Sequence, residues 1–146
     1  MKVFTRVLTL TLVVILLALS LTACAGKRVT DGEYILGDKA LTGCYESYTF
    51  EKKNFFYTTY IQHVKQEELS YSGTYKLEII EPEDEEQKLE DEENMIKRGN
   101  IIFTWTDANG EKKTETKAVV IDEYEWTLTM SATYGDLIYT YYSEEE

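Results

Sequence analysis

An alternation of apolar and polar side chains from Leu69 to Ile80 constrains the fold more than any other stretch of this 146-residue chain. Successive side chains of a β-strand point to opposite faces, so a period of two predicts a strand with one buried and one solvated face. Gly73 falls on the buried face without a side chain, which predicts a bend or bulge. The predicted buried set is Leu69, Tyr71, Gly73, Tyr75, Leu77 and Ile79.

Strand-like segments rich in β-branched and aromatic residues recur along the chain, and short turns such as Asp107-Ala108-Asn109-Gly110 separate them. The connections leave little room for crossover helices, so the strands must form an antiparallel sheet that closes or folds over to bury one face. This predicts an all-β domain, either an up-and-down barrel of seven or eight strands or a β-sandwich. The segments are 33–36 (a short strand or a lid), 45–51, 55–64, 69–80, 101–106, 113–121, 126–130 and 137–141.

The N-terminus has the three-part layout of a secretory signal, with Lys2 and Arg6 before an apolar run from Val7 to Leu19. Leu21-Thr22-Ala23-Cys24 closes this segment and resembles the lipobox of bacterial lipoproteins. That resemblance implies that residues 1–23 are removed and that Cys24 carries the lipid. It also implies a location on the extracytoplasmic side of the cell membrane.

Two other interpretations of the N-terminus remain open. An uncleaved membrane helix needs roughly 20 apolar residues, and the run from Val7 to Leu19 is shorter. An ordinary signal peptide would leave Cys24 as a passenger. With a lipoprotein signal, residues 24–32 are the predicted tether and 33–146 the β domain, including an acidic insertion at 81–98.

The charge balance limits the partners. Removal of residues 1–23 takes away Lys2 and Arg6, which leaves 13 basic against 27 acidic residues and a side-chain charge of −14. Nucleic-acid binding depends on clustered Lys and Arg, so we predict no nucleic-acid partner. Anionic lipid head groups would repel such a surface, and the predicted membrane attachment is therefore the lipid on Cys24.

Few residues of the chain are of the types that take part in disulfide formation, catalysis or metal binding. With Cys24 lipidated, Cys44 has no partner for a disulfide and is predicted to be a small buried hydrophobe. His63 is the one histidine and is predicted to lie at the surface or rim. There is no Ser/His/Asp set, phosphate-binding loop or Cys/His cluster, so the sequence predicts no catalytic residues, no metal, no cofactor and no enzyme activity.

Residues 81–93 contain nine acidic side chains. Calcium binding is one hypothesis, but the segment lacks the alternating ligands and central Gly of an EF-hand. Pro82 at the start, Lys97-Arg98 late and Gly99 after them favour a short exposed helix, with a disordered acidic loop as the alternative.

Three segments together resemble the small bacterial lipocalin-like lipoproteins, a branch of the calycin barrels. They are 41–45 (Leu-Thr-Gly-Cys-Tyr), similar to the Gly-x-Trp opening of the first barrel strand with Tyr45 in place of Trp, 72–75 (Ser-Gly-Thr-Tyr), and 126–130 (Trp-Thr-Leu-Thr-Met). The resemblance spans most of residues 33–142 and implies a barrel that can hold a small apolar ligand.

The favoured function is therefore a binding module for a small ligand or an envelope protein. The alternative is a structural or protein-interaction lipoprotein with a filled barrel and no ligand. A ligand carrier would have an open interior, whereas a packed interior would favour the alternative. The predicted lining residues are Tyr71, Tyr75, Phe103, Trp105, Trp126 and Tyr139.

Overall fold

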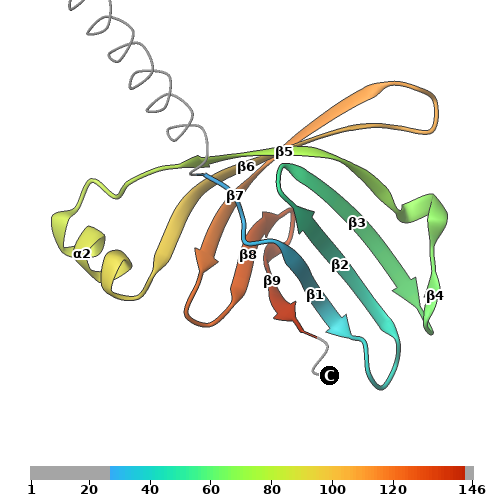
Figure 1. Ribbon diagram of the computed structural model, residues 1–146, viewed down its shortest axis with the longest axis horizontal. Helices are drawn as coiled ribbons and strands as arrows, with labels where there is room; N and C mark the ends of the chain where they lie inside the picture. The colour runs from blue at the N-terminus through green and yellow to red at the C-terminus, as the bar shows by residue number, and fades with distance from the viewer. Residues whose placement is uncertain (1–26, 144–146) are drawn as a thin grey trace, which may run out of the picture.

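Eight antiparallel strands close into a barrel in the computed structural model, which describes residues 27–143 (Figure 1). A two-residue strand, β4 (Val64–Lys65), extends the β3 edge, and a 3₁₀ turn, η1 (Glu67–Leu69), follows it. The segment from Met1 to residue 26, with its predicted lipid site at Cys24, lies outside the described residues. The barrel strands are β1 (Gly32–Asp38), β2 (Cys44–Glu51), β3 (Asn54–Ile61), β5 (Tyr71–Ile79), β6 (Ile96–Thr106), β7 (Lys112–Asp122), β8 (Thr127–Ala132) and β9 (Gly135–Tyr142).

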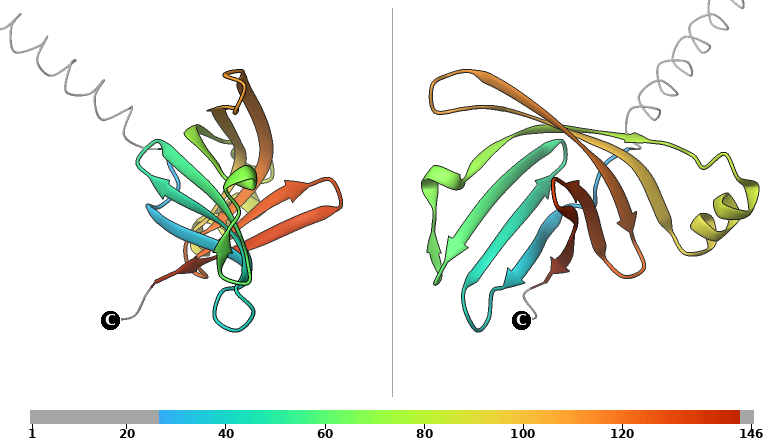
Figure 2. Two further views of the ribbon diagram at one scale, coloured as in Figure 1. Left: turned by 90° about the vertical axis from the view of Figure 1, so that its right-hand side faces the viewer. Right: turned by 180° about the vertical axis from the view of Figure 1, so that it is seen from behind.

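Each barrel strand pairs with the next one along the chain, and β9 pairs with β1 to close the ring. Tyr34 of β1 lies opposite both Tyr48 of β2 and Tyr141 of β9. This is the predicted up-and-down barrel, and it replaces the β-sandwich alternative. Figure 2 shows β5, β6 and β7 curving around the shorter strands.

The barrel interior holds the core. The alternation predicted for residues 71–79 is confirmed, since Tyr75 and Leu77 are buried whereas Thr74 and Lys76 are exposed. Leu69 does not continue this face, because it lies in η1 and is 55% exposed. The aromatic rings of the core pack closely, with ring centroids 4.7 Å apart for Phe55 and Phe103 and 5.1 Å apart for Tyr48 and Phe103.

Gly73 lies at a close approach of two strands. It pairs in regular register with Phe55 and Trp105, so the expected bulge is absent from this part of the sheet. A Cβ atom at position 73 would lie 2.0 Å from the backbone oxygen of Thr104. The backbones of β5 and β6 therefore approach more closely than a side chain would allow.

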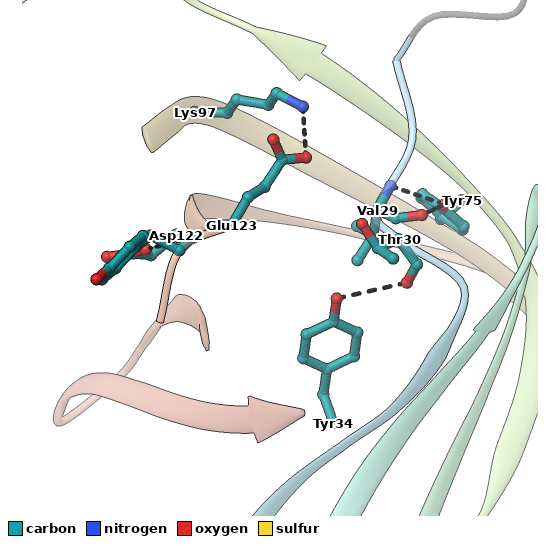
Figure 3. Close-up of polar contacts among 8 residues, drawn as sticks. Val29, Thr30, Tyr34, Tyr75, Lys97, Asp122 and Glu123 are labelled. Carbon is teal, nitrogen blue, oxygen red and sulfur yellow. Dashed lines mark hydrogen bonds and ion pairs between the residues drawn. The ribbon is translucent and has the colours of Figure 1, made fainter. Parts of the chain in front are cut away.

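Residues 27–31, which we call the strap, cross one end of the barrel. The sequence predicts a tether for this segment, but Val29 is fully buried and its N–H donates to the Tyr75 hydroxyl at 3.0 Å. The Asp31 carboxylate accepts the Lys52 backbone N–H at 2.9 Å, and Figure 3 shows Thr30 beside Tyr34. The strap is thus part of the folded domain. We call this end, where β1, β3, β6 and β8 begin, the strap end.

The acidic insertion contains the expected short helix, α2 (Glu85–Glu93), and the side chain of its N-cap, Asp84, accepts the Glu86 N–H at 3.0 Å. The predicted helix end is wrong, because Arg98 lies in β6 and the last turn of α2 has no basic residue. Arg98 instead reaches back from the strand to Asp91, with Nε to Oδ2 at 2.9 Å. None of the helices in residues 27–143 has the length and apolarity needed to cross a membrane.

Two predicted side-chain positions and one predicted strand position are wrong. Cys44 is exposed rather than buried, because it begins β2 at the barrel rim. Trp126 does not face inward with Leu128 and Met130; it lies in the turn before β8 with φ 55° and is 49% exposed. Tyr45 lies in the second barrel strand and stacks outside the core on Tyr60, with ring centroids 4.5 Å apart.

Candidate functional site

A carboxylate surrounded by tyrosines lies in the half of the barrel away from the strap. Glu46 belongs to the same alternating phase of β2 as the buried Tyr48 and Phe50, so its side chain points into the barrel. Around it are aromatic side chains from β2, β3, β5, β6 and β9. We call this group the mouth cluster; it consists of Glu46, Tyr48, Tyr57, Tyr71, Trp105 and Tyr139.

Two tyrosine hydroxyls donate to the two oxygens of Glu46. Tyr139 donates to Oε1 at 3.0 Å, and Tyr57 donates to Oε2. An ionised carboxylate offers about four acceptor positions, so two bonds leave acceptor capacity for another donor. Glu46 is partly exposed, which keeps this capacity within reach of solvent and of a ligand.

The rings of the cluster form a continuous aromatic surface beside the carboxylate. Tyr71 lies between Trp105 and Tyr57, with ring centroid distances of 4.7 and 4.9 Å. Tyr48 contacts Tyr57 at 4.9 Å and Tyr139 at 5.3 Å. Such faces bind apolar groups and also attract cations.

Burial keeps the hydroxyls of the cluster protonated. Loss of hydration raises the pKa of Tyr48, Tyr57, Tyr71 and Tyr139 above the ordinary tyrosine value, because the phenolate form would be poorly solvated. The negative charge of Glu46 raises the pKa of Tyr57 and Tyr139 further. These hydroxyls are therefore hydrogen-bond donors at neutral pH.

An ion pair also lies in the inward phase of β7. Lys117 is in register with the inward-facing Ile101 of β6, and its side chain is 17% exposed. Its Nζ lies 3.6 Å from Oε1 of Glu115, two residues away in the same phase. The inner face of this half of the barrel is thus polar as well as aromatic.

The structure brings three of the six predicted lining residues into the mouth cluster: Tyr71, Trp105 and Tyr139. Phe103 lies deeper, in the packed core, and Tyr75 hydrogen-bonds the strap. Trp126 lies outside the interior and contacts Tyr141, with ring centroids 5.1 Å apart.

Three members of the cluster, Glu46, Tyr48 and Tyr57, were not among the lining residues predicted from the sequence. The spacing of Glu46, Tyr48 and Phe50 places the carboxylate on an apolar strand face, because the three residues stand at every second position. Tyr57 shares a face with Phe55 in the predicted strand. The hydrogen bond from Tyr57 to Glu46 could not be predicted, because it depends on the register of β2 against β3.

The larger hollows among the described residues lie outside the barrel interior. A groove of about 410 Å³ runs between the connection that bears α2 and the outer faces of β6 to β9, lined in part by Arg98, Asn100 and Asp136. A hollow of about 490 Å³ lies at the strap end, beside Lys27, Arg28 and Lys53. Below the mouth cluster, by contrast, Phe50, Phe55 and Phe103 fill the interior and are at most 1% exposed.

Within residues 27–143 no group of three or more His, Cys, Asp and Glu side chains is arranged to hold a metal ion. The protein is thus a small up-and-down β-barrel. Aromatic side chains fill its base, and its mouth is both polar and aromatic. No family model, curated protein or solved structure significantly matches this chain.

Proposed function

We propose that this protein is a lipid-anchored, extracytoplasmic binding module that holds a small ligand at the mouth cluster. The observation that carries the proposal is the inward-facing carboxylate of Glu46, which two tyrosine hydroxyls hold in place beside an aromatic surface. Partial burial of a carboxylate costs free energy unless donors surround it, so a charged group that faces the interior in this position favours recognition over simple packing. The proposed role is non-catalytic.

The chemistry of the mouth cluster indicates the ligand. The free acceptor positions of Glu46 suit an ammonium or another hydrogen-bond donor, and the rings of Tyr71 and Trp105 suit an apolar body or a cation. We therefore propose a small amphipathic amine. The ligand would remain near the mouth, because the core below is filled.

A matched pair of dyes tests the ligand class. Dansylcadaverine carries an alkylammonium group, whereas dansylamide is neutral. We expect the membrane-extracted protein to bind the cationic dye, and Glu46→Gln to weaken that binding at least tenfold while the neutral dye is unaffected. Glu51→Gln, at the exposed end of the same strand, is the control and should change neither.

Equal binding of the two dyes, or equal effects of Glu46→Gln and Glu51→Gln, would contradict the amine proposal. The lipid anchor has a separate test. Globomycin should block maturation, and Cys24→Ala should release the protein from the membrane fraction. A chain that remains membrane-bound after Cys24→Ala would contradict lipid anchoring.

A second candidate is a protein-interaction lipoprotein with a filled barrel. The packed aromatic core favours it, as do the apolar side chains at the mouth-end loops, with Leu41 87%, Ile61 49% and Val64 62% exposed. Native mass spectrometry of the extracted protein separates the two candidates. A retained small molecule supports the ligand module, and a bound protein with no small molecule supports the interaction role.

A further inference from the structure

Basic side chains gather at the strap end, in a chain whose net charge is −12. Lys27, Arg28, Lys53 and Lys76 line the hollow of about 490 Å³ at that end, and Lys52 lies beside Lys53 in the turn between β2 and β3. We call these five residues the basic patch. The distribution of charge is thus uneven, although the total is strongly negative.

Most of the basic patch is free of ion pairs. Among residues 27–143, Lys27, Arg28, Lys52 and Lys53 have no carboxylate oxygen within 4.0 Å, whereas Lys76 pairs with Glu78 at 2.6 Å. All four of these unpaired side chains belong to exposed residues. Their charges therefore remain available to an anionic partner.

Three carboxylates lie near the patch. Asp31 accepts the Lys52 backbone N–H at 2.9 Å, Glu78 is paired with Lys76, and Glu51 is exposed at the end of β2. Together they leave the patch net positive. The acidic helix α2 connects β5 to β6 at the same end of the barrel, but Figure 1 shows it displaced to the left of the point near the end of β5 where the described chain begins.

The patch is also the part of the domain nearest the predicted anchor. Val29 is fixed in the core, and Cys24 precedes it by five residues. At roughly 3.5 Å per residue, Val29 lies no more than about 18 Å from the lipidated residue. Charges held so near a bilayer lie within about one to two Debye lengths of its surface at physiological salt.

We infer that the basic patch docks on anionic phospholipid head groups and that this contact holds the mouth cluster away from the bilayer. The inference rests on the proposed lipid anchor at Cys24. The lipid supplies attachment, and the patch supplies orientation, because the rest of the acidic surface is repelled by the same head groups. β2 runs from Cys44 to Glu51, roughly 23 Å, so the mouth rim is well separated from the patch.

The exposed thiol of Cys44 allows a direct test. The lipidated chain is labelled there with a donor dye and bound to vesicles that contain acceptor-labelled lipid. On vesicles of 30% phosphatidylglycerol in phosphatidylcholine, we expect energy transfer at least twofold lower than on pure phosphatidylcholine. Salt at 0.5 M should remove the difference, because it screens the head-group charge.

Two double variants with the same change in charge provide the control. Lys52→Gln with Lys53→Gln should abolish most of the difference between the vesicles. Lys112→Gln with Lys113→Gln, at the opposite end of the barrel, should preserve it. Equal transfer on the two vesicles, or equal effects of the two double variants, would overturn the inference.

The mass of the purified chain shows whether Cys24 is lipidated, and so distinguishes failure of the proposed orientation from failure of the proposed anchor. A lipidated chain with equal transfer on both vesicles overturns the orientation alone and leaves the anchor intact. A chain without lipid at Cys24 overturns the anchor and, with it, the orientation. Circular dichroism of each variant confirms that the barrel is folded before transfer is compared.

Discussion

The hydrogen bond from Tyr139 to Glu46 allows a quantitative test of the mouth cluster. Tyr139→Phe removes a hydroxyl that donates to Oε1 of Glu46 at 3.0 Å from a side chain that is 2% exposed. A hydrogen bond to a charged group contributes about 1.5 to 3 kcal/mol. Because Glu46 is partly exposed and water screens its charge, we expect a loss of about 1 to 2 kcal/mol in the free energy of unfolding.

Urea denaturation followed by tryptophan fluorescence measures this loss, and thermal unfolding should show a lower Tm by roughly 3 to 8 °C. In the Glu46→Gln background the acceptor is neutral, and a neutral bond contributes about 0.5 to 1.5 kcal/mol. Tyr139→Phe should therefore lower the free energy of unfolding by less in the Glu46→Gln background. The double-mutant cycle should give a coupling energy of about 1 kcal/mol between Tyr139 and Glu46.

Tyr134→Phe is the control, because it deletes the same hydroxyl from a fully exposed residue and should leave stability unchanged within about 0.5 kcal/mol. A coupling below about 0.3 kcal/mol between Tyr139 and Glu46 would refute the reasoning. In that case the carboxylate would not be held by this hydroxyl, and the mouth cluster would not be preorganised.

Three further predictions concern the barrel. Val29→Ala should lower the free energy of unfolding by about 1.5 to 3 kcal/mol in urea denaturation, because Val29 is fully buried; an unchanged midpoint would show that the strap is not part of the core. Gly73→Ala should cost at least about 2 kcal/mol, since its Cβ would lie 2.0 Å from the Thr104 backbone oxygen, whereas Thr74→Ala should be nearly neutral; equal stability of the two variants would contradict the close strand approach. Burial raises the pKa of Tyr34 from 10.0 to about 12, so its neutral form contributes stability that is complete below pH 10 and is lost as the pH rises toward 12. Absorbance at 295 nm and near-ultraviolet circular dichroism should therefore change together above pH 10, and ionisation of all tyrosines near pH 10 in an intact fold would contradict this.

Much of the barrel could be predicted from the spacing of side chains. The alternation around Tyr75 and Leu77 identified a half-buried strand, because the period of two in a β-strand is a local property of the backbone. The predicted turn at Asp107–Gly110 is present, with Gly110 at φ 82° and the Asp107 side chain accepting the Asn109 N–H at 2.9 Å. The predicted acidic helix also forms.

Other positions depend on tertiary structure, and the predictions made for them from the sequence are wrong. Trp126 continues the pattern of Leu128 and Met130, but the turn before β8 places it in solvent. Cys44 lies at the barrel rim, where its strand has left the core. Arg98 pairs with Asp91 across the insertion, a contact between β6 and α2 that has no local periodicity.

The sequence by itself determined an all-β domain, its inward-facing apolar pattern and the acidic helix, because each of these follows from neighbours within a few residues. Only the tertiary structure decided that the sheet closes between β1 and β9, since closure depends on the register and twist of eight strands. Closure brings Tyr139 of β9, 93 positions further along the chain, against Glu46 of β2. The contact of Glu46 with Tyr57 follows instead from the register of β2 against β3. Closure also fixes the strap at the opposite end, which separates the polar mouth from the basic patch.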